Sequence, residues 1–140
     1  MHESILRDFF LGKADAKALS KDIEGSLAIM SPPGAPYSKT SDGIVKMDSE
    51  VDLSRTHLLI LCDAFLSGRL SAIDLEYIAF ALIASEKFNW DADQDDTLAA
   101  ILHDWAAPEI NYPLNVENVQ RCCRWLEGTE KYPDRAGATT

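Results

Sequence analysis

The chain has 140 residues, of which 46% are hydrophobic, and its 23 acidic and 13 basic residues give a formal net charge of −10. This length suffices for one hydrophobic core, so we expect a single domain. The charge argues against a nucleic acid or an anionic membrane as a direct partner, because both would repel the protein, and it favours a basic protein partner. Solubility alone is the alternative role of the charge.

The first residues contain neither a basic segment nor a long apolar run. We therefore expect no secretory signal, no membrane-spanning helix and a cytoplasmic location. The three cysteines, Cys62, Cys122 and Cys123, have no spacing typical of a disulfide framework or a metal site. They are expected to be buried thiols in a reducing compartment, and no cofactor is expected.

Two helices are predicted in the amino-terminal part. The first has apolar residues at helical spacing: Ile5, Leu6, Phe9 and Phe10. It should end at Gly12, because glycine suits the left-handed conformation that closes a helix. Asp15 is the predicted N-cap of the second helix, which should end before Ser31 because two prolines follow. Its apolar stripe is Leu19, Ile23, Leu27 and Met30.

A long loop is predicted over residues 31–52, where Pro, Gly, Ser and Asp dominate. A small hairpin across Asp42 and Gly43 is an alternative, because this pair is the strongest turn signal in the segment. A loop of this length inside a compact domain is often mobile or used for contact with a partner. We expect one of these two roles here.

The stretch Leu58–Ala84 is expected to organise the fold. It contains two almost wholly apolar helices, and a helix without a polar face belongs inside the protein. The first should begin after Ser54 or Thr56, and the second, about residues 72–86, has Ser71 as its predicted N-cap. We therefore predict an all-α domain, an antiparallel bundle of about six helices with this hairpin at its centre.

Two amphipathic helices complete the prediction. The first has a regular apolar stripe: Leu98, Ile101, Leu102 and Trp105. It should end at Pro108, and residues 109–114 should form an extended connection. Asn115 is the predicted N-cap of the last helix, which should end at Gly128. Its predicted inward residues are Val116, Val119, Cys123 and Leu126. The domain would then cover residues 1–128, with a flexible tail over 129–140.

The feature most informative for function is the absence of Lys and Arg from residues 88–120, which contain seven carboxylates. A helix N-terminus favours acidic residues, yet one cap and one or two first-turn acids satisfy that need. Mutual repulsion among the others indicates a surface that binds cationic groups of a partner. A solvated acidic surface is the alternative. The predicted partner-binding residues are Trp90, Asp91, Asp93, Asp95, Asp96, Glu109, Tyr112 and Glu117.

Trp90 and Tyr112 belong to this set because large amphipathic side chains are enriched among the residues that dominate binding energy. A calcium site is not expected. Asp91, Asp93 and Asp95 copy the first three alternate ligands of an EF-hand loop, but neither the required glycine nor the required glutamate follows at its position. No hydrolase, metalloprotease or nucleotide-binding motif is present, so we expect a protein that is not an enzyme.

Residues 65–72 read Phe-Leu-Ser-Gly-Arg-Leu-Ser-Ala and precede an apolar helix. This segment resembles the opening of the small, acidic, all-helical immunity proteins of the colicin D type. The resemblance implies an antiparallel helical bundle that occupies the basic RNA-binding cleft of a secreted nuclease toxin. We therefore expect an immunity protein that neutralises a toxin or nuclease. The alternatives are a phage-encoded inhibitor of a nuclease defence system, acting by charge mimicry, and a non-catalytic scaffold or regulatory subunit.

Overall fold

The computed structural model describes residues 1–30 and 43–133 of the chain. Within these residues the protein is mostly helical, with six helices and one short sheet of two strands. The helices are α1 (Glu3–Phe10), α2 (Ala16–Met30), α3 (Arg55–Leu66), α4 (Ala72–Ala84), α5 (Asp96–Ala106) and α6 (Val116–Glu127). The prediction of a mostly helical chain with about six helices is confirmed.

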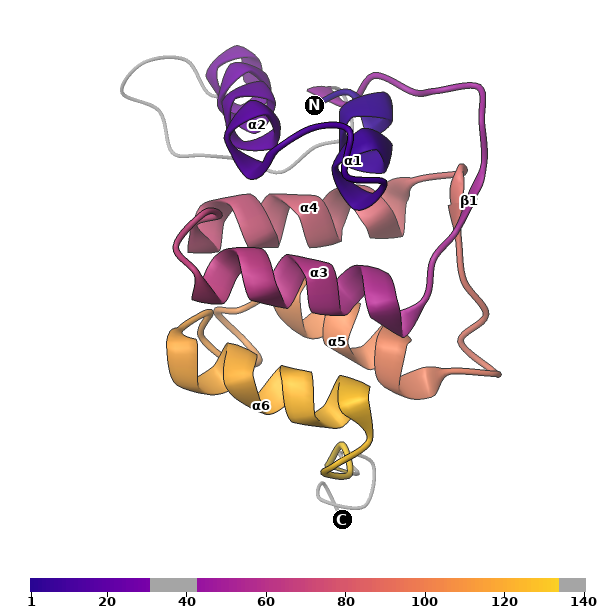
Figure 1. Cartoon of the computed structure of the whole chain (residues 1–140), viewed down its shortest axis with the longest axis vertical. Coiled ribbons are helices and arrows are strands. Elements are labelled where there is room, and N and C mark those ends of the chain that lie inside the picture. Colours follow the sequence, from indigo (N-terminus) through magenta and orange to yellow (C-terminus); the bar gives the residue numbers. More distant parts are fainter. Residues whose placement is uncertain (31–42, 134–140) are drawn as a thin grey trace.

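The apolar helices α3 and α4 cross the middle of the molecule, with α1 and α2 on one side and α5 and α6 on the other (Figure 1). Helix α3 packs mainly against α6, whereas α4 packs against α5 and α2. Both central helices contribute side chains that are wholly buried, among them Leu58, Leu61, Leu75, Ile78 and Leu82. Burial on several sides explains why these helices have almost no polar face.

Local sequence signals set the helix ends. Three predicted N-caps are confirmed, because a side-chain oxygen accepts the backbone N–H three residues later at 2.8, 3.1 and 2.8 Å: Asp15, Ser71 and Asn115. Of the two alternatives for α3, Ser54 is the N-cap, and its N–H donates to Nδ1 of His57 at 3.0 Å. In the described residues only Gly12, Gly68 and Gly128 have positive φ, and each follows a helix.

A short parallel sheet joins two segments that lie far apart in the sequence. Strand β1 (Val51–Asp52) pairs with β2 (Phe88–Asn89). The sequence did not predict these strands, because two residues are too few to show an alternating pattern. The alternative hairpin lies partly outside the described residues, since Asp42 is not described. In the described part, Val45 instead forms a bridge with His2.

The buried carboxylate of Glu3 ties α1 to the second part of the predicted long loop. It accepts a hydrogen bond from the backbone N–H of Met47 at 3.0 Å and another from the hydroxyl of Ser85, which follows α4. The N–H of Glu3 donates to the carbonyl of Val45 at 2.9 Å. A carboxylate inside a protein requires such donors. Residues 43–50 are therefore packed on α1, while 31–42 lie outside the described residues.

The buried face of α6 differs in part from the prediction. Val116 was predicted to point inward but is 55% exposed, and Cys123 is half-buried. The residues buried in this helix are Val119, Cys122, Trp125 and Leu126. The prediction was wrong for Val116 because it assumed that the whole helix is covered. Burial begins only at Val119, one turn into the helix that packs on α3.

The connection between α5 and α6 begins with a turn rather than an extended segment. The N–H of Ile110 donates to the carbonyl of Ala107 at 3.3 Å, and the side-chain amide of Asn111 donates to the same carbonyl at 3.1 Å. The last carbonyls of a helix lack partners within the helix, and these donors supply one. The prediction of an extended connection was therefore wrong for its first half.

The predicted tail, residues 129–140, is described as far as Pro133. In this part the ring of Tyr132 lies edge-on to that of Trp125, with 4.8 Å between the ring centroids. Its hydroxyl donates to the buried carboxylate of Asp104 at 2.7 Å. Tyr132 therefore covers the end of α6. No helix of the described residues is both long and apolar enough to cross a membrane.

Candidate functional site

The acidic run before α5 folds into a turn, which we call the acidic turn (residues 91–96). The carboxylate of Asp91 accepts the N–H of Asp93 at 2.9 Å, and the Asp91 carbonyl accepts the N–H of Asp95 at 2.9 Å. Three of its side chains, Asp91, Asp93 and Asp96, are exposed. None of the three forms an ion pair with a described Lys, Arg or His. The acidic turn thus presents three carboxylates to solvent that form no ion pair with a described residue, although the charge of Asp96 helps to raise the pKa of Arg55.

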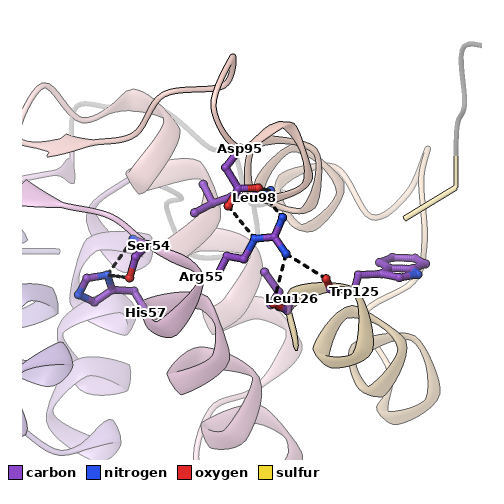
Figure 2. Close-up of polar contacts among 7 residues, drawn as sticks. All are labelled: Ser54, Arg55, His57, Asp95, Leu98, Trp125 and Leu126. Carbon is purple, nitrogen blue, oxygen red and sulfur yellow. Dashed lines mark hydrogen bonds and ion pairs between the residues drawn. The ribbon is translucent and has the colours of Figure 1, made fainter. Parts of the chain in front are cut away.

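Asp95 has a different role from its neighbours, because its carboxylate is bound within the chain (Figure 2). Both of its oxygens accept hydrogen bonds from the guanidinium of Arg55, from Nε at 2.7 Å and from Nη2 at 2.8 Å. The same carboxylate caps α5 by accepting the N–H of Leu98 at 3.1 Å. Asp95 was predicted to bind a partner, but the structure shows it paired with Arg55 in the described chain.

Arg55 joins three helices at this end of the molecule. It is the first residue of α3, and its Nη1 donates at 3.4 Å to the carbonyls of Trp125 and Leu126 near the end of α6. Figure 2 shows the guanidinium between those carbonyls and Asp95. Hydrogen bonding to Arg55 lowers the pKa of Asp95, and the same contact raises the pKa of Arg55. The start of α5 and the end of α6 are thereby held together.

Two of the predicted acidic residues lie elsewhere. Glu109 follows α5 and Glu117 is in the first turn of α6, and both are exposed. Glu117 is 3.9 Å from Arg121, a loose contact across one helical turn, and Glu109 forms no ion pair with a described residue. Helix α5 has 11 residues. Such a helix is about 16 Å long. The predicted acidic residues therefore form two groups, one at each end of α5 (Figure 1).

The two aromatic residues of the predicted set are both half-buried. Trp90 precedes the acidic turn and packs against the hydrophobic core. Tyr112 also packs on the core, and its ring centroid lies 6.1 Å from that of Trp125. Each aromatic side chain therefore has a structural contact within the chain. Each also keeps an exposed part that a partner could reach.

A groove of about 420 Å³ lies between the first turns of α4 and the α5–α6 connection. It is lined by Ala72, Ile73, Glu76, Pro108, Glu109, Asn111, Pro113 and Leu114. Most of these residues are apolar, and the charged ones are both glutamates. Sequence reasoning missed the groove because its two walls come from segments more than 30 residues apart. Glu109 belongs to both this lining and the predicted partner-binding set, and Tyr112 of that set lies between the lining residues Asn111 and Pro113.

The cysteines form a contact that their spacing did not reveal. The thiols of Cys62 in α3 and Cys123 in α6 interact, and this interaction raises the pKa of Cys62 and lowers that of Cys123. Burial raises the pKa of Cys122 to about 11. Cys62 and Cys122 are buried, whereas Cys123 is half-buried. The prediction of buried thiols thus holds for two of the three residues.

No three His, Cys, Asp or Glu side chains gather as metal ligands in the part of the chain that the structure describes. The EF-hand pattern fails for a structural reason as well as a sequence one, because Asp95 is occupied by Arg55 and by the start of α5. His57 lies in the first turn of α3, two residues after Arg55, and its Nδ1 accepts the N–H of the N-cap residue Ser54. Burial lowers the pKa of His57, and its ring lies 4.9 Å from that of Phe10. His57 therefore serves the helix start.

Comparison of the chain with protein-family models, curated proteins and solved structures finds no match. The resemblance of residues 65–72 to immunity proteins of the colicin D type therefore stays a hypothesis. In the structure these residues are the turn between α3 and α4, where Gly68 has φ of 80° and Ser71 caps α4. The acidic turn and the groove are the two surface features of the described chain that could bind a partner.

Proposed function

We propose that this protein is an acidic binding inhibitor that occupies the nucleic-acid-binding site of a basic protein partner. The observation that carries the proposal is the acidic turn, where Asp91, Asp93 and Asp96 are exposed and have no described cation within ion-pair distance. Each carboxylate can meet a lysine or arginine that otherwise contacts a phosphate. More specifically, we propose that the protein is an immunity protein that neutralises a toxin or nuclease.

The cost of gathering these charges supports a binding role. Like charges at close range repel one another, and helix α5 needs only one cap, which Asp95 provides. Of the other three aspartates, Asp91 accepts one hydrogen bond within the turn, and none forms an ion pair with a described residue. Facing a basic surface, the same charges attract the partner and speed its association. A binding role accounts for an arrangement that stability alone does not require.

The ion pair of Arg55 with Asp95 gives the acidic turn a rigid base. Asp95 is held by Arg55 of α3, and Arg55 also donates to two carbonyls of α6, so the turn that carries the three exposed carboxylates is tied at Asp95 to two helices. A partner then meets a surface that is ordered before binding, which lowers the entropic cost of association. On this proposal Asp95 positions the binding residues and does not itself contact the partner.

The proposal is a non-catalytic one, in which the protein acts in the cytoplasm as an antiparallel helical bundle. The bound partner is excluded from nucleic acid by simple occupation of its basic site. A phage-encoded inhibitor that mimics nucleic-acid charge would use the same surface. The immunity protein and the phage inhibitor would therefore differ in the origin of the partner and not in the contact. A partner that cleaves nucleic acid would support either function.

The test is affinity capture of partners from a lysate of the source organism, followed by a nuclease assay of each captured protein with and without this chain. The decisive variant carries Asp91→Asn, Asp93→Asn and Asp96→Asn. We expect the wild-type protein to capture a basic nuclease, to inhibit it, and to release it at high salt. The affinity of the triple variant for the captured nuclease should be at least about tenfold lower, because each lost charge contact contributes up to about 1 kcal/mol.

A matched control carries Glu24→Gln, Asp48→Asn and Glu50→Gln, which remove the same charge from exposed carboxylates elsewhere. This control should retain most of the affinity. Equal loss of affinity in both triple variants would mean that net charge, and not the acidic turn, drives binding. A captured partner that neither is basic nor cleaves nucleic acid would contradict the proposed function itself.

A further inference from the structure

The groove between α4 and the α5–α6 connection is lined mainly by apolar residues. Two of the five large hydrophobic residues that are exposed in the described chain belong to the segments that form it: Ile73 and Ile110, which are 55% and 79% exposed. Ile73 lines the groove, and Ile110 lies between the lining residues Glu109 and Asn111. Exposed apolar groups that gather around a hollow mark a binding site.

The size of the site favours a protein segment over a small molecule. A volume of about 420 Å³ lies within the usual range for a ligand pocket and suits one or two large side chains. Ile110 does not line the groove, so a small molecule inside the groove would leave this side chain in water. A chain segment that inserts an apolar side chain also covers the residues beside the hollow, as the anchors of protein interfaces do.

Charge decides the nature of the segment. Among the described residues that line the groove, none is a Lys, Arg or His, and the charged ones are the half-buried Glu76, which already interacts within the chain, and the exposed Glu109. A second copy of this chain would bring its own carboxylates and a net charge of −10 against these glutamates. A segment with lysines or arginines beside an apolar anchor instead pairs both kinds of group at once.

We propose that this groove binds a basic segment of the partner, which inserts a large apolar side chain between Ile73 and the α5–α6 connection while a cation beside that side chain pairs with the exposed carboxylate of Glu109. The inference rests on the proposed function, because it assigns a second contact to the same basic partner. The acidic turn attracts that partner through charge alone. The groove adds a contact that depends on apolar shape and therefore provides specificity.

The test uses the full chain and two synthetic peptides of equal length and charge, one of alternating Lys and Leu and the other of alternating Lys and Ser. Binding is followed by the backbone amide signals in NMR spectra. We expect the Lys/Leu peptide to shift the signals of Ile73, Ile110 and Asn111, and to bind about tenfold more tightly than the Lys/Ser peptide, the effect of a buried anchor.

Variants of exposed residues locate the contact without endangering the fold. Ile73→Ser should weaken Lys/Leu binding about tenfold. Glu109→Gln should weaken it by up to about fivefold, as for a rim charge pair. The matched control is Leu11→Ser, since Leu11 is 60% exposed but lies beyond α1 and does not line the groove. This control should bind the peptide like the wild type.

Three results would overturn the inference. Equal binding of both peptides, with shifts confined to the acidic turn, would show charge attraction without the groove and leave the proposed function intact. A concentration-dependent dimer in sedimentation, lost in Ile73→Ser, would assign the groove to a second copy. Absence of binding by either peptide would contradict the groove contact and the attraction of basic segments together.

Discussion

At the scale of single residues, Asp95 shows how one side chain of a repetitive acidic run differs from its neighbours. Four aspartates precede Leu98, and their sequence context is nearly the same. Asp95 alone among them accepts both a guanidinium and a helix N–H in the described structure. The difference comes from Arg55, which is 40 residues away in the sequence. A contact over such a distance leaves no local pattern.

The variant Asp95→Asn should lower the free energy of unfolding by up to about 1 kcal/mol at neutral pH, because asparagine still caps the helix but loses the partly exposed ion pair. Since the pKa of Asp95 is lowered in the folded protein, its stabilising effect is complete above the ordinary aspartate pKa of about 3.9. The effect should disappear as pH falls through the lowered folded-state pKa. Urea unfolding of both proteins over a pH series measures this difference.

The control for that measurement is Asp93→Asn, since Asp93 is exposed and has no described cationic partner. Its free energy of unfolding should stay within about 0.5 kcal/mol of the wild type. If Asp95→Asn lost as much stability at acid as at neutral pH, the ion pair would not be the source of the effect.

At the scale of helices and turns, local rules account for nearly every helix end. The caps of α2, α4 and α6 were predicted from single residues, and each forms the hydrogen bond that its type implies. The turn between α3 and α4 depends on Gly68, whose φ of 80° is unfavourable for residues with a Cβ atom. That turn also positions Ile73 beside the groove, so its geometry affects the proposed contact.

Gly68→Ala should lower the free energy of unfolding by about 1–2 kcal/mol, because alanine is strained in the left-handed conformation. No atom lies within 4 Å of an added Cβ, so a steric clash does not contribute. The matched control is Gly25→Ala within α2, where space is also open. It should raise the free energy of unfolding by about 0.5–1 kcal/mol. Urea unfolding of both variants checks the opposite signs, and equal signs would contradict the explanation.

At the scale of the whole molecule, negative charge dominates. The formal net charge is −10, and the ion pairs of the described residues are mostly exposed and few. Repulsion among the remaining carboxylates opposes the compact state. The acidic turn and the pair Glu109 and Glu117 lie toward opposite ends of α5, so each group presents a separate negative potential to a partner (Figure 1). The distance between them also limits their mutual repulsion.

Salt should therefore stabilise the folded protein. Raising NaCl from about 10 mM to about 150 mM shortens the Debye length from about 30 Å to about 8 Å, which screens repulsion between distant charges. We expect the urea midpoint to rise, and to rise less in the variant that lacks the charges of Asp91, Asp93 and Asp96. A midpoint that fell with salt would show that attractive pairs such as Arg55–Asp95 outweigh the repulsion.

The sequence by itself determined the mostly helical class, the extent of the central apolar helices, and the caps, because helix periodicity and capping act within a few residues. It also located the acidic stretch, since charge can be counted. Only the tertiary structure decided that Asp95 forms an ion pair with Arg55, that Val116 is exposed, and that a groove opens beside Ile73. Each of these depends on contacts between segments far apart in the chain, and such contacts have no local signal from which to predict them.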